Sequence, residues 1–260
     1  MQLGISDLSV IPVRREPSEK AEMVNQILFG EKYEIIEKTD KWAKIRLLHD
    51  GYSGWIDSKM LIELSSDISS DEGKYVTTET FNIVSRLDTW GNKLLVPGAN
   101  LPFFNKDSKN FKIGDVEYIL NGDIQDIPKD KNLRDVIIDF ALKYYNSPYL
   151  WGGRTPYGID CSGLTQIVYK LVNISIPRDA SQQVEVGDTL LFVDEAMPGD
   201  LAFFGDEDGG ITHVGMIWKH HKIIHASGKV RIDNIDQEGI YNEEMRRYTH
   251  KLRTIKRILR

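Results

Sequence analysis

Apolar and polar residues alternate over short stretches in the first quarter of the chain. The alternation is clearest over residues 8–13, 26–29, 32–37, 42–47 and 54–57, with glycine and aspartate turns between them. Short strands at this spacing are typical of a small antiparallel barrel. We therefore predict an all-β domain over residues 1–63.

A second strand-rich region follows a polar segment. Residues 64–74 read LSSDISSDEGK, which is the composition of a linker or an exposed loop. Residues 75–127 carry turn signals at WGN, PG and NGD, so they predict a second, divergent β domain.

The periodicity changes after Pro128. Apolar residues recur at helical spacing over residues 132–146, and a second helix is expected to run from Cys161 to Lys170. A short polar helix is expected over residues 179–185, followed by strands over 200–204, 213–218, 222–225 and 248–259. Helices followed by an antiparallel sheet indicate an α+β domain over residues 130–260.

Charge and composition exclude several classes of protein. The net charge of −6 and the pI near 5.6 argue against a nucleic-acid partner or an anionic membrane surface. We expect no membrane span, because no segment approaches the roughly 18 apolar residues that one needs. The N-terminus lacks a signal-peptide pattern, which predicts a cytoplasmic protein. The alternative is a periplasmic protein whose signal peptide has been removed.

Cys161 is the only cysteine among the 260 residues, so it has no intrachain disulfide partner. It stands where a loop enters a predicted helix, and a helix N-terminus favours a thiolate. His213 and His225 follow in separate apolar, strand-like runs. One cysteine and two histidines are sufficient for a nucleophile, a base and a group that orients the base. Taken alone, a lone cysteine is more often a small buried hydrophobic residue.

Five segments of the C-terminal half stand out together: PYLWGGRTPYGIDCSGL, PRDASQQ, PGDLAFF, ITHVGM and IIHASGKV. They resemble the NlpC/P60 family of cell-wall peptidases, which implies a papain-like α+β catalytic domain. The order VR.EPS…GE…W.KIR…G..GWI in residues 1–63 resembles bacterial SH3-like domains. We therefore expect one or two small SH3-like barrels in front of the peptidase domain.

The resemblance implies a catalytic set of Cys161 as nucleophile, His213 as base and His225 as the residue that orients it. A thiolate–imidazolium pair would keep the nucleophile and the base ready. We expect no metal, since the histidines and Cys161 have no zinc-ligand spacing, and we expect no cofactor. The Cys161 amide is the expected oxyanion donor.

The combination with SH3-like barrels is similar to peptidases that cleave the γ-D-glutamyl-diamino acid bond of murein peptides. It implies a tripeptide or tetrapeptide substrate with a free N-terminal L-Ala, cleaved in cell-wall recycling. A buried ammonium group needs a carboxylate, for which Asp160 is the first candidate. The other candidate substrate-binding residues are Tyr149, Trp151, Ser162, Ser181 and Glu22.

Each of these interpretations has a structural alternative. Asp160 would also serve as a helix cap, Tyr149 and Trp151 as core aromatics, and Glu22 as a solvated surface charge. Arg178 is as well suited to a structural ion pair as to a substrate carboxylate. Trp42 and Trp55 are expected in the barrel core. The remaining histidines, His49, His220, His221 and His250, are expected to have no part in the site.

Two other functions remain open at this point. The chain would be a cell-wall-binding protein if its peptidase domain were inactive, or an acyltransferase or amidase if the same thiol chemistry served another acyl group. The sequence does not decide the oligomeric state or the preference between lysine and diaminopimelate.

Overall fold

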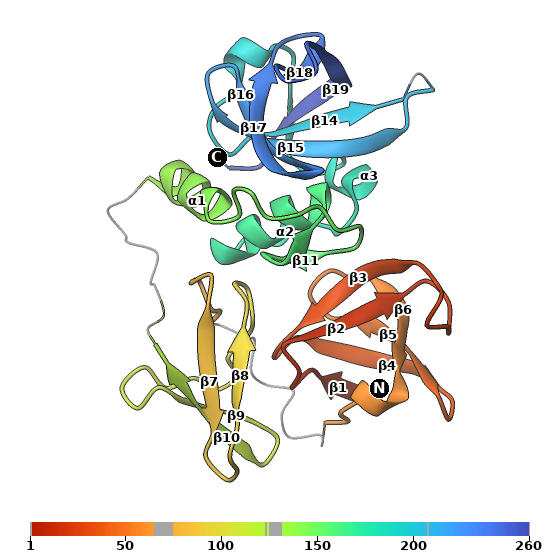
Figure 1. Ribbon diagram of the computed structural model, residues 1–260, viewed down its shortest axis with the longest axis vertical. Helices are drawn as coiled ribbons and strands as arrows, with labels where there is room; N and C mark the ends of the chain where they lie inside the picture. Colours follow the sequence, from red (N-terminus) through yellow and green to blue (C-terminus); the bar gives the residue numbers. More distant parts are fainter. Residues whose placement is uncertain (1, 65–74, 123, 125–131, 207, 260) are drawn as a thin grey trace. The chain divides into compact units, whose positions relative to one another are not determined.

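The computed structural model describes all residues except 1, 65–74, 123, 125–131, 207 and 260. The chain divides into two compact units, Met1–Asp126 and Ile127–Arg260 (Figure 1). The predicted linker lies outside the described residues except for Leu64.

The first unit begins with a six-stranded antiparallel sheet in the order β1-β4-β5-β6-β2-β3. Alternate residues such as Ile11, Ile27 and Ile45 are fully buried in its core, as the period-two pattern predicts. The prediction for Trp42 and Trp55 is wrong, because both are only half-buried at the sheet surface. The strands are β1 (Gln2–Ile5), β2 (Val10–Arg14), β3 (Met23–Leu28), β4 (Lys32–Lys38), β5 (Trp42–Leu47) and β6 (Ser53–Asp57), followed by the 3₁₀ turn η1 (Ser58–Met60).

A four-stranded antiparallel sheet in the order β8-β7-β10-β9 completes this unit. Phe29, in the turn after β3, packs edge-on against Phe111 and Tyr118 of the second sheet, so the two sheets share one core. Gly30 permits this approach, since a Cβ there would lie 2.2 Å from the Asn100 carbonyl oxygen. That this region is a second SH3-like barrel stays a prediction. Its strands are β7 (Asn82–Arg86), β8 (Asn92–Leu95), β9 (Asn110–Ile113) and β10 (Val116–Asn121).

The second unit starts with helices. Helix α2 packs against α1 and against strands β15 and β16 (Figure 1), and every residue of α2 except Lys170 is buried. Helix α1 ends earlier than the apolar spacing predicts, because the chain turns at Asn146, whose amide donates to the Val230 carbonyl (2.9 Å). The helices are α1 (Leu133–Leu142), α2 (Cys161–Leu171) and α3 (Ala180–Gln183).

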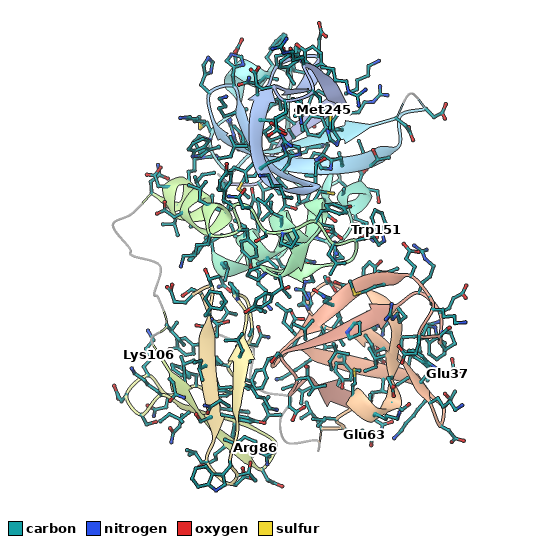
Figure 2. The ribbon with its side chains drawn as sticks, viewed as in Figure 1. Glu37, Glu63, Arg86, Lys106, Trp151 and Met245 are labelled. Carbon is teal, nitrogen blue, oxygen red and sulfur yellow. The ribbon has the colours of Figure 1, made fainter. Side chains whose placement is uncertain are left out.

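A seven-stranded antiparallel sheet follows in the order β13-β19-β14-β15-β16-β17-β18. Strand β18 also pairs with β19, so six of the strands close into a ring around an apolar core. The turn between β18 and β19 carries the exposed Met245 (Figure 2). The strands are β13 (Asp188–Leu190), β14 (Leu201–Gly205), β15 (Ile211–Lys219), β16 (Lys222–Ser227), β17 (Lys229–Ile235), β18 (Gly239–Asn242) and β19 (Arg247–Arg257), with the 3₁₀ turn η3 (Val193–Glu195) and a two-stranded ribbon of β11 (Arg154–Thr155) and β12 (Gly158–Ile159).

Asp200, fully buried just before β14, ties the helices to this sheet. Its carboxylate accepts from Arg134 of α1 (3.0 Å) and from Arg257 of β19 (2.8 Å). The Tyr169 hydroxyl of α2 donates to the neighbouring Gly199 carbonyl (2.7 Å). These contacts tie α1 and the C-terminal part of α2 to the sheet. Among the described residues, no helix is long and apolar enough to cross a membrane.

Candidate active site

Cys161 is the first residue of α2, as the sequence predicts. Asp160 is the N-cap, and its Oδ1 accepts from the Gly163 amide at 2.6 Å. The cap satisfies one free amide of the first turn, which stabilises the helix end that carries the thiol. The thiol itself is buried.

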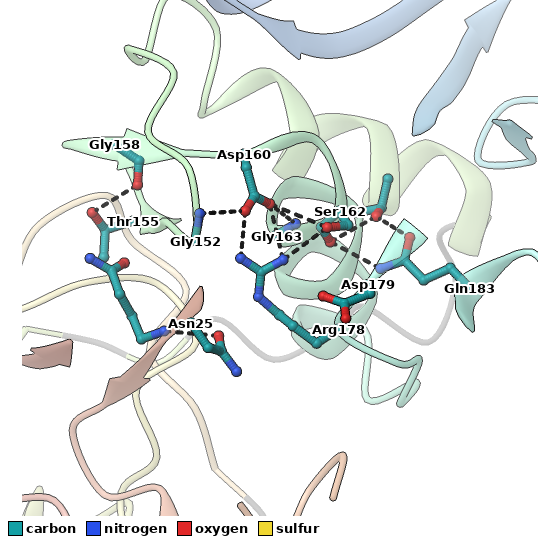
Figure 3. A network of polar contacts seen from close by, with 12 residues as sticks. Asn25, Gly152, Thr155, Gly158, Asp160, Ser162, Gly163, Arg178, Asp179 and Gln183 are labelled. Carbon is teal, nitrogen blue, oxygen red and sulfur yellow. Dashed lines mark hydrogen bonds and ion pairs between the residues drawn. The ribbon is translucent and has the colours of Figure 1, made fainter. Parts of the chain in front are cut away.

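The Asp160 carboxylate is the centre of a buried network (Figure 3). Arg178, 1% exposed, donates to Oδ1 at 3.0 Å and to Oδ2 at 2.6 Å. The Gly152 amide donates to Oδ2 at 2.8 Å, and the Ser162 hydroxyl lies 3.3 Å from Oδ1. Asp160 is therefore a helix cap, and Arg178 is its ion-pair partner. A carboxylate offers about four lone-pair directions, so these contacts nearly saturate it.

Two glycines let the loop before Asp160 lie directly on the helix. A Cβ at Gly163 would stand 2.3 Å from the Gly153 carbonyl oxygen, and a Cβ at Gly153 would stand 2.4 Å from the Gly158 carbonyl oxygen. Neither position tolerates a side chain without moving backbone. The GG and CSG motifs are thus explained by this close approach.

His213 of β15 and His225 of β16 lie side by side on adjacent strands. The His213 Nε2 atom is 2.9 Å from His225 Nδ1, and their rings meet edge to face. Gly215 faces His225 across the two strands, and a Cβ there would approach His225 Cβ to 2.9 Å. Both histidines are buried, so the structure brings together the pair that the sequence predicts.

Asp233 of β17 continues this chain of side chains, and the sequence reasoning missed it. Its Oδ2 lies 3.0 Å from His225 Nε2. Arg231 binds the same carboxylate through Nε (2.7 Å) and Nη2 (3.0 Å). Burial alone would raise the pKa of Asp233, but the hydrogen bonds from His225 and Arg231 lower it. A charged pair two residues apart in KVRIDNI was the available signal, since such residues share one face of a strand.

His250 of β19 also belongs to the site, so its interpretation as a residue outside the site is wrong. Its half-buried ring stacks on that of His213 with centroids 4.1 Å apart, and it meets the ring of His225 edge-on at 5.6 Å. Burial lowers the pKa of His250 to about 4. The His250 ring therefore contacts both of the other histidines.

The three histidines are close enough to be considered as a metal site, with ligand atoms within 4.8 Å of one another. Their geometry favours hydrogen bonding instead. The planes of His213 and His250 are inclined by only 26° in a stacked pair, so their in-plane lone pairs do not converge on one ion. A bound ion would also have to break the bond between His213 and His225.

Electrostatics around the thiol favour the neutral form. Burial and the charge of Asp160 raise the pKa of Cys161 to about 11, although the Val214 backbone amide and Arg178 act in the opposite direction. Burial and the neighbouring histidines hold the pKa of His213 well below its ordinary value. Both shifts favour the neutral thiol and imidazole over the ion pair that the sequence analysis expects.

The other predicted substrate-binding residues differ in their burial and in their partners. Tyr149 is half-buried. Burial, and to a smaller extent the charges of Cys161 and Asp160, raises its pKa to about 12. The Ser162 hydroxyl accepts from Arg178 at 2.8 Å. Ser181 and Trp151 are exposed, so Trp151 is no core residue. Glu22 belongs to the first unit, where Arg15 donates to its carboxylate at 2.5 Å.

Comparison with known proteins shows which family the chain resembles. Residues 146–250 match the NlpC/P60 family, and residues 13–61 match the bacterial dipeptidyl-peptidase SH3 domain. A probable endopeptidase NlpC of Escherichia coli is 34% identical over 40% of this chain and 68% of its own length. The chain belongs to the NlpC/P60 family. It is a cysteine peptidase, with an SH3-like region in front of its NlpC/P60 domain.

Two further similarities cover most of the chain. A γ-D-glutamyl-L-lysine dipeptidyl-peptidase of Bacillus subtilis is 29% identical over 85% of this chain and 78% of its own length. The crystal structure of an NlpC/P60 family protein from Bacillus cereus matches with a TM-score of 0.82 and 20% identity, covering 99% of this chain and 100% of that one. This structural match shows the fold alone.

The raised pKa of the thiol predicts how Cys161 reacts with iodoacetamide. Alkylation follows the thiolate fraction, so the rate in the substrate-free protein should rise about tenfold per pH unit between pH 7 and pH 9. The rate is measured by mass spectrometry of intact protein, with Cys161→Ser as the unreactive control. A rate that is already constant below pH 8 would show a preformed thiolate and contradict this electrostatic description.

The three neutral histidines predict a loss of stability in acid. Their pKa values in the folded state lie below the ordinary value of 6.5. The unfolded chain therefore takes up more protons as the pH falls below 6.5, and the free energy of unfolding decreases. Urea unfolding curves from pH 7 to pH 5 should show a falling midpoint.

Substitution tests whether His250 contributes to the loss of stability in acid. His250→Gln should reduce the slope of this pH dependence by about one proton, whereas His220→Gln, at an exposed position, should leave the slope unchanged. A midpoint that is constant from pH 7 to pH 5 would contradict the assignment of neutral buried imidazoles.

Proposed function

We propose that this protein hydrolyses the γ-D-glutamyl-diamino acid bond of free murein peptides, L-Ala-γ-D-Glu-diamino acid, and releases L-Ala-D-Glu. The strongest support is the hydrogen bond between His213 and His225 beside a buried thiol at a helix N-terminus. The Bacillus subtilis relative, which is named for this bond with L-lysine as the diamino acid, is 29% identical over 85% of this chain.

The proposed acylation step uses Cys161, His213 and His225 in different roles. His213 Nε2 is held by His225, which leaves Nδ1 to accept the thiol proton. The sulfur attacks the γ-carbonyl carbon of D-Glu and forms a tetrahedral oxyanion. His213 then returns the proton to the amine of the diamino acid, which leaves as the C–N bond breaks. The product is a thioester between Cys161 and the L-Ala-γ-D-Glu acyl group.

The N-terminus of α2 and His213 also act in the proposed hydrolysis of the thioester. Asp160 binds the Gly163 amide of the first turn, while the Cys161 amide is the proposed donor to the oxyanion. A water molecule then attacks the thioester carbonyl and gives a proton to His213 Nδ1. The proton returns to the sulfur as the thioester bond breaks, which restores the neutral thiol and releases the dipeptide.

Recognition of a free N-terminal amine belongs to the same proposal. It would restrict the enzyme to free peptides, because in intact cell wall this L-Ala nitrogen forms an amide bond to the glycan. Recycling of released peptides in the cytoplasm is consistent with such a substrate. The amine contact predicted for Asp160 stays a prediction, and an ammonium there would have to share a carboxylate already bound by Arg178 and two amides.

Incubation with L-Ala-γ-D-Glu-L-Lys and with L-Ala-γ-D-Glu-diaminopimelate tests which bond the protein cleaves. Mass spectrometry should detect L-Ala-D-Glu and the free diamino acid from at least one of the two peptides. Cys161→Ser should reduce turnover by more than about 10⁴-fold, because it removes the nucleophile at nearly constant shape. No product from the wild-type protein with either peptide would favour a binding protein or another acyl substrate.

A matched pair of substrates tests the terminal amine. N-acetylation of L-Ala removes the charge and leaves the scissile bond unchanged, so kcat/KM should fall by about 10²-fold or more, the cost of leaving a charged partner unpaired in the protein. Equal cleavage of the acetylated and free peptides would contradict amine recognition while leaving the peptidase assignment intact.

A further inference from the structure

Asp233 stands at the far end of the chain of side chains that runs from His213 through His225. Its carboxylate is buried and lies 3.0 Å from His225 Nε2. The two hydrogen bonds from Arg231 keep both of its oxygens in place. An ionised carboxylate only accepts hydrogen bonds, and the pKa of Asp233 lies below its ordinary value. The hydrogen of His225 must therefore sit on Nε2.

The hydrogen on His225 Nε2 determines where His213 carries its own hydrogen. Burial lowers the pKa of His225, so its ring is neutral and carries a single hydrogen. With Nε2 protonated, Nδ1 is an acceptor, and it takes the hydrogen of His213 Nε2 at 2.9 Å. The neutral ring of His213 then has its lone pair on Nδ1.

We propose that Asp233, held by Arg231, is a positioning residue that fixes the tautomers of His225 and His213 so that His213 Nδ1 is the base for Cys161. Asp233 touches neither the substrate nor the thiol in this scheme. It acts through two successive hydrogen bonds. The proposal rests on the function proposed above for its kinetic test but not for its spectroscopic test.

The same arrangement stabilises the charged intermediate state. When His213 Nδ1 takes the thiol proton, Nε2 keeps its hydrogen and continues to donate to His225 Nδ1. The positive charge of the imidazolium balances the negative charge on the sulfur or oxyanion, and no proton moves to Asp233. The negative charge of Asp233 favours the imidazolium through the neutral His225 ring.

The charged and titratable groups around this chain come from several elements. Arg231 of β17 faces Asp233 and also contacts Glu244 beyond β18 (3.3 Å). His250 of β19 stacks on His213, and Cys161 of α2 faces β15 through the Val214 amide. Arg231 is the only cation that the described residues place on Asp233. Asp233→Asn therefore removes the buried negative charge that His225 contacts.

Nitrogen-15 NMR of histidine-labelled protein at pH 7 measures the tautomers without any substrate. His213 and His225 should both show a bare Nδ1 and a protonated Nε2, with assignments made from His213→Gln and His225→Gln. In Asp233→Asn the amide has only one acceptor oxygen for donors from both Arg231 and His225. The two rings should then show mixed tautomers. The same single tautomers in both proteins would overturn the proposal.

Kinetics give the second readout. Asp233→Asn should lower kcat by roughly 10²- to 10⁴-fold with KM nearly unchanged, because the substrate does not contact Asp233. Asp233→Glu keeps the charge and should recover part of the loss. The matched control is Glu243→Gln, an exposed carboxylate that binds Asn234 at 2.6 Å, and it should retain wild-type kcat.

The outcomes separate this proposal from the proposed function. Wild-type kcat in a folded Asp233→Asn protein would overturn the positioning of His213 by Asp233. An equal loss in Asp233→Glu and Asp233→Asn, with unchanged tautomers, would reduce Asp233 to a packing residue. If the wild-type protein cleaves neither murein peptide, the proposed function fails, and the NMR measurement still decides the tautomer assignment.

Discussion

The site depends on the contact between the first turn of α2 and strand β15. The thiol stands at the helix end and the base on the strand, so a small shift between them would separate the two groups. The buried Asp200 anchors α1 and β19 at the start of β14, and Tyr169 anchors α2 at the same turn. Gly153 and Gly163 allow the preceding loop to lie on the helix. Cys161 and His213 are 52 residues apart in the chain, with only β13 and β14 as strands between α2 and β15. Packing alone therefore holds the two side chains in one site.

Two buried carboxylates, each held by an arginine, organise the charges on either side of the reacting groups. Asp160 with Arg178 caps the helix beside the thiol, and Asp233 with Arg231 lies behind the two histidines. A buried carboxylate without a partner is costly, and pairing with a fixed guanidinium offsets this cost and fixes its orientation. Between them, the thiol and imidazole remain neutral until the reaction requires their charges. In the proposed mechanism the reacting proton moves from the Cys161 sulfur to His213 Nδ1.

The sequence predicts the parts of the site whose signals are local. The helix that begins at Cys161, the strands that carry His213 and His225, and the strand alternation of the first sheet all follow from periodicity and turn residues. His250 and Asp233 were missed because their positions depend on tertiary pairing. Strand β19 reaches His213 only through its register with β14 and β18, and β17 places Asp233 beside His225 only once β16 and β17 pair. Burial, which raises the pKa of Cys161, also could not be predicted from the sequence, because it depends on the packing around the thiol.

In the proposed mechanism Cys161 carries the γ-glutamyl acyl group, with His213 as its base. Rapid acid quenching during turnover of an L-Ala-γ-D-Glu-diamino acid peptide, followed by mass spectrometry of the digested protein, tests it directly. We expect a transient mass increase of one L-Ala-D-Glu acyl group on the peptide that contains Cys161, and none in His213→Gln. Turnover of the peptide with no adduct on Cys161, or with the adduct on another residue, would contradict it.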